Sequence, residues 1–155
     1  MRRFAWIAVL FVSALARGDA PVGGDASKPK MAVLWSVSQH FFGAEAFSIF
    51  SDATTRYEFL PPQGRERGRK PESKRGKLAA GELEKLRKVM LDHKFCSLRS
   101  GRNGVPDEAM PNVDVDLPGL KCSVTLWDGE WRNDPDASAV EKALMDLMEK
   151  TAGHR

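Results

Sequence analysis

The hydrophobic pattern over residues 31–60 predicts three β-strands. The run 31–37 (MAVLWSV) is apolar and β-prone, and we expect it to form the first strand. Further along, apolar residues alternate with polar ones in two short runs: Phe47, Ile49, Tyr57 and Phe59. A period of two indicates a hairpin that is buried on one face. A three-residue loop centred on Ala53 would place Ile49 opposite Tyr57 and Phe47 opposite Phe59.

The next periodic segment is a helix. The polar stretch 61–77 contains glycine and proline and is expected to be a connection. In residues 78–93 the apolar side chains then recur at the spacing of one helix face: Ala79, Leu83, Leu86 and Met90. Residues 100–111 (SGRNGVPDEAMP) are expected to form an irregular loop.

The sequence Leu117-Pro118-Gly119-Leu120 predicts a tight turn, because proline and glycine occupy the two central positions of a type II turn. Counting outward from this turn pairs Asp116 with Lys121, Val115 with Cys122, Asp114 with Ser123 and Val113 with Val124. Every apolar residue then falls on one face of the hairpin. A shift of one residue would destroy this separation, so the register is a specific prediction.

A second turn is expected at Asp128-Gly129, which would pair Leu126 with Trp131 and Thr125 with Arg132. The result would be a three-stranded meander. A final helix should follow, capped by Asp134 or Asp136. Its apolar stripe is formed by Val140, Leu144, Leu147 and Met148.

These elements predict an α+β fold: an antiparallel sheet of about five to six strands with two helices packed on one face. The layout from about Phe47 to Ala152 resembles small exported bacterial domains of unknown function and, distantly, the emfourin-type inhibitors of thermolysin-like metalloproteases. The resemblance rests on Phe47-Ser48-Ile49, the helix Gly81 to Met90, Phe95, Asp107, the strand-turn-strand ending in Trp127-Asp128-Gly129, and the closing helix. It implies a fold and a possible inhibitory role, but no inhibitory residue of that family maps onto this chain.

The first sixteen residues are typical of a cleavable signal peptide. Arg2 and Arg3 precede an apolar run, and Ala14-Leu15-Ala16 offers small residues for cleavage. An uncleaved anchor is the alternative, but the apolar run falls short of the roughly 20 residues that a membrane-spanning helix needs. We therefore expect a secreted or periplasmic protein with no stable membrane span after cleavage. Residues 17–30 would form a flexible lead-in, and residues 31–152 a single domain.

Export changes the interpretation of the two cysteines, Cys96 and Cys122. Cys96 follows the predicted helix, and Cys122 lies on the buried face of the predicted hairpin. In an oxidising compartment such a pair favours a structural disulfide. Two buried thiols are the alternative, and a catalytic cysteine is unsupported because no histidine or carboxylate is tied to either residue by spacing.

The whole chain carries 24 basic and 21 acidic side chains, and the predicted signal peptide removes two of the arginines. The mature chain is therefore close to neutral, which argues against nucleic acid as a partner. One segment is strongly basic, residues 65–77 (RERGRKPESKRGK). It contains no aromatic residue for base stacking, so it is either a solvated loop or a contact for an unknown protein or an anionic envelope component. The candidate contact residues are Arg69, Lys70, Lys74 and Arg75.

Trp127 is a further candidate, because the meander would place it on the face opposite Cys122, where it could contact a partner or pack against charged side chains. No cofactor motif is present, and the three histidines do not form a metal-binding cluster. We therefore expect a non-catalytic domain that binds a protein or envelope component, with protease inhibition as one version. The alternative is a small exported hydrolase that uses His40 with a carboxylate and with Ser36, Ser38 or Ser123.

Overall fold

In the part of the chain that the structure describes, six antiparallel strands form one sheet, in the order β4-β3-β2-β1-β5-β6. The computed structural model describes residues 28–39, 43–62, 70–101 and 108–153. In chain order from β1 to β6, the strands span Met31–Gln39, Gly43–Phe50, Thr54–Leu60, Glu72–Lys77, Asn112–Leu117 and Leu120–Thr125. The expected signal peptide (1–16) and residues 17–27 of the expected lead-in lie outside the described residues.

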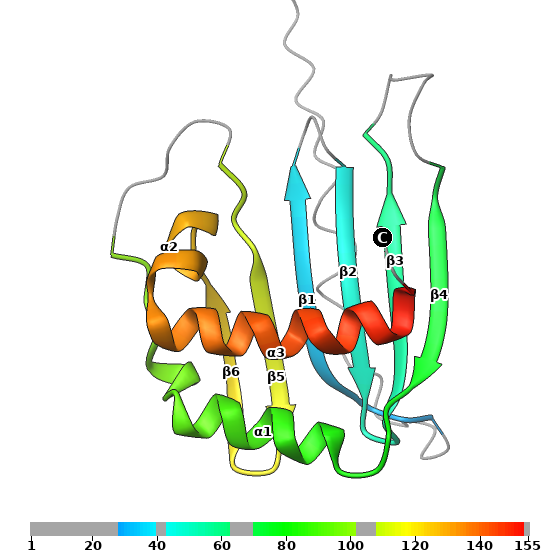
Figure 1. Cartoon of the computed structure of the whole chain (residues 1–155), viewed down its shortest axis with the longest axis horizontal. Coiled ribbons are helices and arrows are strands. Elements are labelled where there is room, and N and C mark those ends of the chain that lie inside the picture. Colours follow the sequence, from blue (N-terminus) through cyan, green and yellow to red (C-terminus); the bar gives the residue numbers. More distant parts are fainter. Residues whose placement is uncertain (1–27, 40–42, 63–69, 102–107, 154–155) are drawn as a thin grey trace, which may run out of the picture.

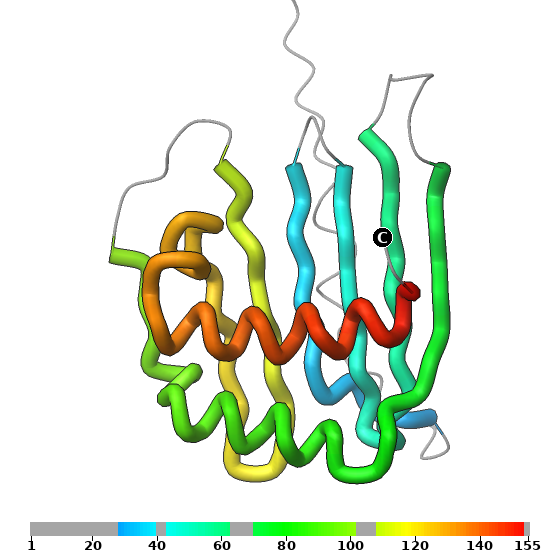
Figure 2. The backbone as a smooth tube through the Cα atoms, in the orientation of Figure 1, coloured from blue at the N-terminus to red at the C-terminus, as the bar shows by residue number. Residues whose placement is uncertain are grey.

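Three α-helices accompany the sheet: α1 (Glu82–Asp92), α2 (Asp128–Asn133) and α3 (Pro135–Ala152), together with a short 3₁₀ turn, η1 (Phe95–Ser97). Both long helices, α1 and α3, cross the same face of the sheet (Figure 1). They run in opposite directions, and the end of α3 reaches the β3–β4 side of the sheet (Figure 2). The predicted α+β class is therefore confirmed. In the described part of the chain, no helix has the length and apolar character required to cross a membrane.

The core lies between the sheet and the two long helices. The central strands and the helices both contribute side chains that are no more than 6% exposed: Val33, Trp35, Phe47, Ile49, Tyr57, Leu86, Met90, Val140, Leu144 and Leu147. Burial of this apolar surface is the main favourable term that holds the helices on the sheet. We call the face that they cover the helix face and the opposite one the outer face.

The β5–β6 hairpin has the register that the turn sequence predicts. Val115 lies opposite Cys122 and Asp116 opposite Lys121. Gly119 adopts a φ of 73°, a conformation that glycine tolerates without steric cost. The predicted separation of apolar and polar side chains is also observed in β5: Val113 and Val115 are buried, whereas Asp114 and Asp116 are only half-buried.

The β2–β3 hairpin differs from the prediction by two residues. Phe47 lies opposite Tyr57, and Ile49 lies opposite Thr55. The three-residue loop is centred on Asp52 instead of Ala53, because the Asp52 carboxylate accepts a hydrogen bond from the Thr54 amide (3.0 Å) and closes the turn earlier. Side chains alternate with a period of two, so this shift leaves the apolar residues on the predicted face.

The polar segment 61–77 is not a connection throughout, because its last six residues, Glu72–Lys77, form β4. This correction has a simple physical reason. β4 is an edge strand in which no residue is fully buried, so it lacks the apolar alternation by which strands are found in a sequence.

Asp128-Gly129 does not form a hairpin turn, and the third strand of the predicted meander is absent. These residues begin α2 instead. Glu130 accepts a hydrogen bond from the Trp127 amide (3.0 Å), and Asp128 forms an ion pair with Arg132 (2.6 Å) one helical turn later. Both contacts stabilise a helix and cannot form in the expected hairpin. The predicted pairs Leu126 with Trp131 and Thr125 with Arg132 are therefore wrong, although Leu126 and Trp131 are both buried.

Asp134, one of the two expected caps, begins α3. Its carboxylate accepts hydrogen bonds from the amides of Asp136 and Ala137, both at 2.9 Å. Pro135 follows as the first helical residue, where its missing N–H costs nothing. Asp136 has another role, because its carboxylate contacts His93 Nδ1 at 2.7 Å, next to the C-terminus of α1.

The cysteines form the predicted bridge. Cys96, in η1, is bonded to Cys122, in β6, with an S–S distance of 2.04 Å and a Cα–Cα distance of 5.6 Å. The neighbouring residue Phe95 is buried and stacks on Trp131 of α2, with ring centroids 6.2 Å apart. The bridge and this aromatic pair together attach the end of α1 to the β6 edge of the sheet.

Replacement of both cysteines with alanine should lower the free energy of unfolding by about 3–4 kcal/mol, because the bridge closes a substantial loop. Urea unfolding of the wild type and the variant measures the difference. Reduction with dithiothreitol should produce the same loss in the wild type and no loss in the variant. A wild-type protein that keeps its stability under reducing conditions would contradict a structural role for the bridge.

Candidate functional site

Strand β4 divides its side chains between the two faces of the sheet. Lys74 lies opposite Tyr57, which is fully buried under the helices, so Lys74 is on the helix face. Because side chains alternate along a strand, Ser73, Arg75 and Lys77 are on the outer face. The basic residues that the sequence singled out therefore do not form one surface.

Lys74 contributes to the fold. Its Nζ donates a hydrogen bond to the carbonyl oxygen of Ala152, the last residue of α3, and it forms an ion pair with Glu72 at 2.9 Å. A cation at this position interacts favourably with the negative end of the helix dipole. Lys74 is thus occupied by contacts within the chain.

Gly76 lets α3 approach this part of the sheet. A Cβ atom at Gly76 would lie 2.9 Å from Thr55 Oγ1, so that one of the two would have to shift, and 3.3 Å from Thr151 Cγ2, which is a tight contact. Thr55 and Thr151 share a hydrogen bond of 2.8 Å between their hydroxyl groups. Nearby, Lys150 of α3 forms an ion pair with Glu82 of α1 and holds the pKa of that carboxyl below its usual value.

The outer face of the same two strands places two arginines side by side. Arg75 lies directly opposite Arg56 of β3. Directly opposite residues have Cβ atoms only about 4.5–5.5 Å apart, and like charges at that spacing destabilise a sheet. One Arg56 Nη donates to Glu58 at 2.6 Å, and Arg75 forms no ion pair within the described part of the chain. Lys77 is two residues further along β4, so this part of the sheet carries three cations; the nearby carboxylates are Glu58, which pairs with Arg56, and Asp52, whose pKa is lowered by its hydrogen bonds to Thr54 and, to a smaller extent, by the charge of Lys77.

Arg56 also has an unmet hydrogen-bonding requirement. Its Nε is buried and, within the described residues, has no acceptor. A buried donor without an acceptor costs about 1–3 kcal/mol. The Arg56 side chain as a whole is 43% exposed, so a carboxylate, sulfate or phosphate could bind the exposed part of its guanidinium together with Arg75 and relieve the repulsion between the two arginines. We call Arg56, Arg75 and Lys77 the cationic face.

Sequence reasoning named Arg75 and included Lys77 in the basic segment 65–77, but it missed Arg56. The alternation in β3 does predict that Arg56 lies on the polar side of its strand. Its proximity to Arg75, however, depends on a β4 strand that the apolar pattern does not indicate. Of the other predicted contacts, Lys70 is exposed just before β4, and Arg69 lies outside the described residues.

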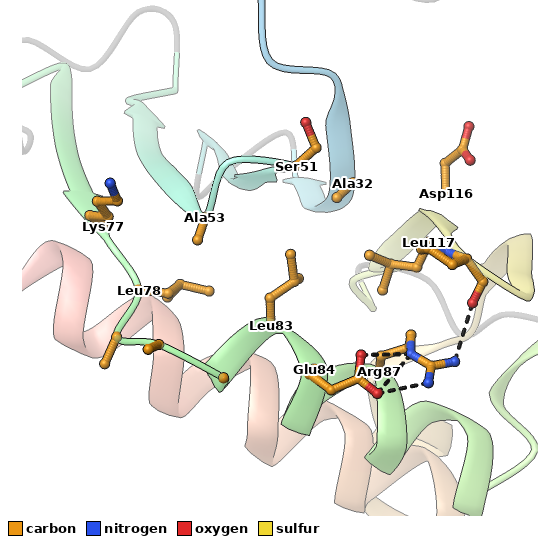
Figure 3. Close-up of a pocket in the computed structure, with 14 residues that line it drawn as sticks. Ala32, Ser51, Ala53, Lys77, Leu78, Leu83, Glu84, Arg87, Asp116 and Leu117 are labelled. Atoms are coloured by element: carbon orange, nitrogen blue, oxygen red, sulfur yellow. Dashed lines mark hydrogen bonds and ion pairs between the residues drawn. The ribbon is translucent and has the colours of Figure 1, made fainter.

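A pocket of about 580 Å³ lies at one end of the sheet, where α1, the β2–β3 turn and the β5–β6 turn meet. Figure 3 shows Leu78, Leu83 and Leu117 in its lining, with Arg87 bonded to Glu84. Its volume is within the range of small-molecule sites. The lining is largely apolar and could accommodate an aliphatic side chain of a partner.

Apart from Lys77, the charged residues at the rim of this pocket are paired within the chain. Arg87 donates to Glu84 (2.7 Å) and to the carbonyl of Pro118 (3.2 Å). Asp116 contacts Lys30 (2.6 Å) and Lys121 (3.4 Å), and Lys30 is the largest cause that lowers the pKa of this carboxyl. These pairs tie the pocket walls together.

Trp127 does not lie on the outer face of a strand, because β6 ends at Thr125. It is half-buried and precedes α2, where its carbonyl accepts hydrogen bonds from the amides of Glu130 and Trp131. Trp127 is not part of the cationic face. Its position gives no specific indication of a partner.

The residues proposed for hydrolysis are only partly described, because His40 lies outside the described ranges. The Ser123 hydroxyl donates to Asn112 at 3.1 Å, on the outer face of the β5–β6 hairpin. Ser36 is opposite Asn112 on the neighbouring strand β1, and Ser38 is exposed further along that strand. The described residues include no group of three or more histidine, cysteine, aspartate or glutamate side chains arranged to hold a metal ion.

Comparison with known proteins does not assign the chain to a family. No protein-family model matches it, and no curated protein matches it either.

Replacement of Lys74 with alanine should lower the free energy of unfolding by about 1 kcal/mol, because the last carbonyl of α3 loses its cationic partner. Replacement of Arg75 with alanine is the matched control, one position along the same strand. It should leave the stability within about 0.5 kcal/mol of the wild type. Thermal or urea unfolding measures both. Equal losses in the two variants would contradict the division of β4 into a structural and an outer side.

Proposed function

We propose that this protein is an exported, non-enzymatic domain that binds acidic groups of a partner on its cationic face. The observation that carries the proposal is the position of Arg56 directly opposite Arg75, whose side chain is exposed and forms no ion pair among the described residues. Like charges at this spacing repel each other, so a bound anion that interacts with both arginines would be favourable.

Two features support export. The N-terminal sequence has the charge, apolar run and small residues of a signal peptide. The disulfide between Cys96 and Cys122 suits an oxidising compartment. The partner would then be a protein or an anionic component of the cell envelope. Nucleic acid is not expected there.

A protein partner agrees best with the rest of the surface. The apolar pocket beside Leu78 and Leu83 could take a hydrophobic side chain, and its rim includes Lys77, which also belongs to the cationic face. A partner that combines acidic and apolar residues could use both. Inhibition of an exported protease, which the emfourin-like layout suggests, is one form that such binding could take.

The proposal can be tested with a double charge reversal, Arg75→Glu with Lys77→Glu. The probe is a glutamate-rich peptide, and its affinity is measured by fluorescence anisotropy at low ionic strength. We expect the reversal to weaken binding at least about tenfold, because the attraction becomes repulsion. The double variant Lys85→Glu with Lys88→Glu carries the same change of charge on exposed positions of α1 and should bind like the wild type.

The two variants separate a specific site from general electrostatics. Equal weakening in both would mean that only net charge matters and would contradict the proposed site. A parallel measurement with a sulfated glycan and with vesicles of an anionic lipid identifies the source of the anion. Binding to these probes without binding to the peptide would replace the protein partner with an envelope component.

A further inference from the structure

Strand β4, which carries Arg75 and Lys77 of the cationic face, has an open edge. β4 is at the end of the strand order, and Figure 1 shows it at the margin of the sheet. No described residue pairs with its open side. An unpaired edge offers backbone N–H and C=O groups to another extended segment.

One hydrogen bond shows which residues of β4 direct their backbone N–H and C=O groups toward β3 and which direct them away. The Leu78 amide donates to the carbonyl oxygen of Ala53 at 2.9 Å, immediately after the strand. In an antiparallel ladder, bonded and non-bonded pairs alternate. Lys74 and Gly76 therefore direct their backbone groups toward β3. Ser73, Arg75 and Lys77 direct theirs toward the open edge.

The same residues that offer free backbone groups also carry the outer-face side chains. A strand added antiparallel to β4 would place its residues directly opposite Arg75 and Lys77, with their side chains on the outer face. Those two partner residues are two positions apart. Carboxylates at positions i and i+2 would therefore meet Arg75 and Lys77.

The charge on this edge indicates the kind of strand that it accepts. Two copies of β4 placed edge to edge would bring Arg75 and Lys77 close to the same cations of the other copy, which is unfavourable. Basic side chains on an edge are a known means of preventing such self-association. An acidic extended segment would be attracted instead, because its backbone can form hydrogen bonds with the open edge and its carboxylates can pair with Arg75 and Lys77.

We propose that β4 binds an extended segment of the partner as a seventh, antiparallel strand, and that it selects segments with acidic residues at alternate positions. This inference rests on the proposed function and adds the mode of binding and the sequence pattern that is recognised. The residue between the two acids would lie opposite Gly76, on the helix face.

The test uses peptides of eight residues and the full mature chain. One peptide alternates glutamate with threonine, and a second has the same composition with the glutamates in one block. We expect the alternating peptide to bind at least about fivefold more tightly, because only its carboxylates all fall on the outer face. Isothermal titration calorimetry gives both dissociation constants.

N-methylation of the alternating peptide tests the backbone contribution. Methyl groups on the glutamate amides block the N–H groups that would face β4, and the same number on the threonine amides blocks N–H groups that would point away. Strand addition predicts that the first peptide loses binding and the second keeps it. Both peptides retain the same charges.

The outcomes distinguish the mode of binding from the site itself. If all peptides bind equally and Arg75→Glu abolishes binding, the cationic face is correct and strand addition is wrong. If no peptide binds, and Arg75→Glu has no effect with any anionic probe, the proposed function fails and the strand-addition proposal fails with it.

Discussion

The structure depends on the docking of α3 against strands β3 and β4. Gly76 provides the space, the hydroxyl groups of Thr55 and Thr151 are bonded at 2.8 Å, and Lys74 pairs with the last carbonyl of the helix. These contacts take up the helix-face side chains of β4. Because side chains alternate along a strand, the same docking leaves Arg75 and Lys77 on the outer face.

At the opposite edge of the sheet, beside β6, the helices are held by a disulfide and an aromatic pair. The disulfide between Cys96 and Cys122 joins η1 to β6, and Phe95 stacks on Trp131 of α2. Anchors at both edges of the sheet keep the helices on one face and therefore keep the outer face of β3 and β4 in a fixed geometry. The proposed site on these strands would gain from this rigidity, because its charged groups would be held in position before a partner binds.

The elements that could be predicted from the sequence are those with strong local patterns. The turn at Pro118-Gly119 predicted the register of the β5–β6 hairpin. That register placed Cys122 on the buried face, where the disulfide to Cys96 could be expected. β4 could not be recognised, since an exposed edge strand such as Glu72–Lys77 has no apolar alternation. The prediction of a hairpin turn at Asp128-Gly129 was wrong, because Glu130 and Arg132 make contacts that stabilise a helix and that the hairpin pattern does not reveal. The cationic face was found only in part, since Arg56 and Arg75 meet through strand pairing.

Amide hydrogen exchange along β4, followed by NMR, tests this account most directly. The backbone phase predicts slow exchange at Lys74 and Gly76, which point toward β3, and fast exchange at Ser73, Arg75 and Lys77. Uniformly fast exchange would mean that this segment does not pair with β3. The reverse pattern would mean that the backbone groups of Arg75 and Lys77 point toward β3. Either result would contradict the division of β4 into a structural side and an outer side.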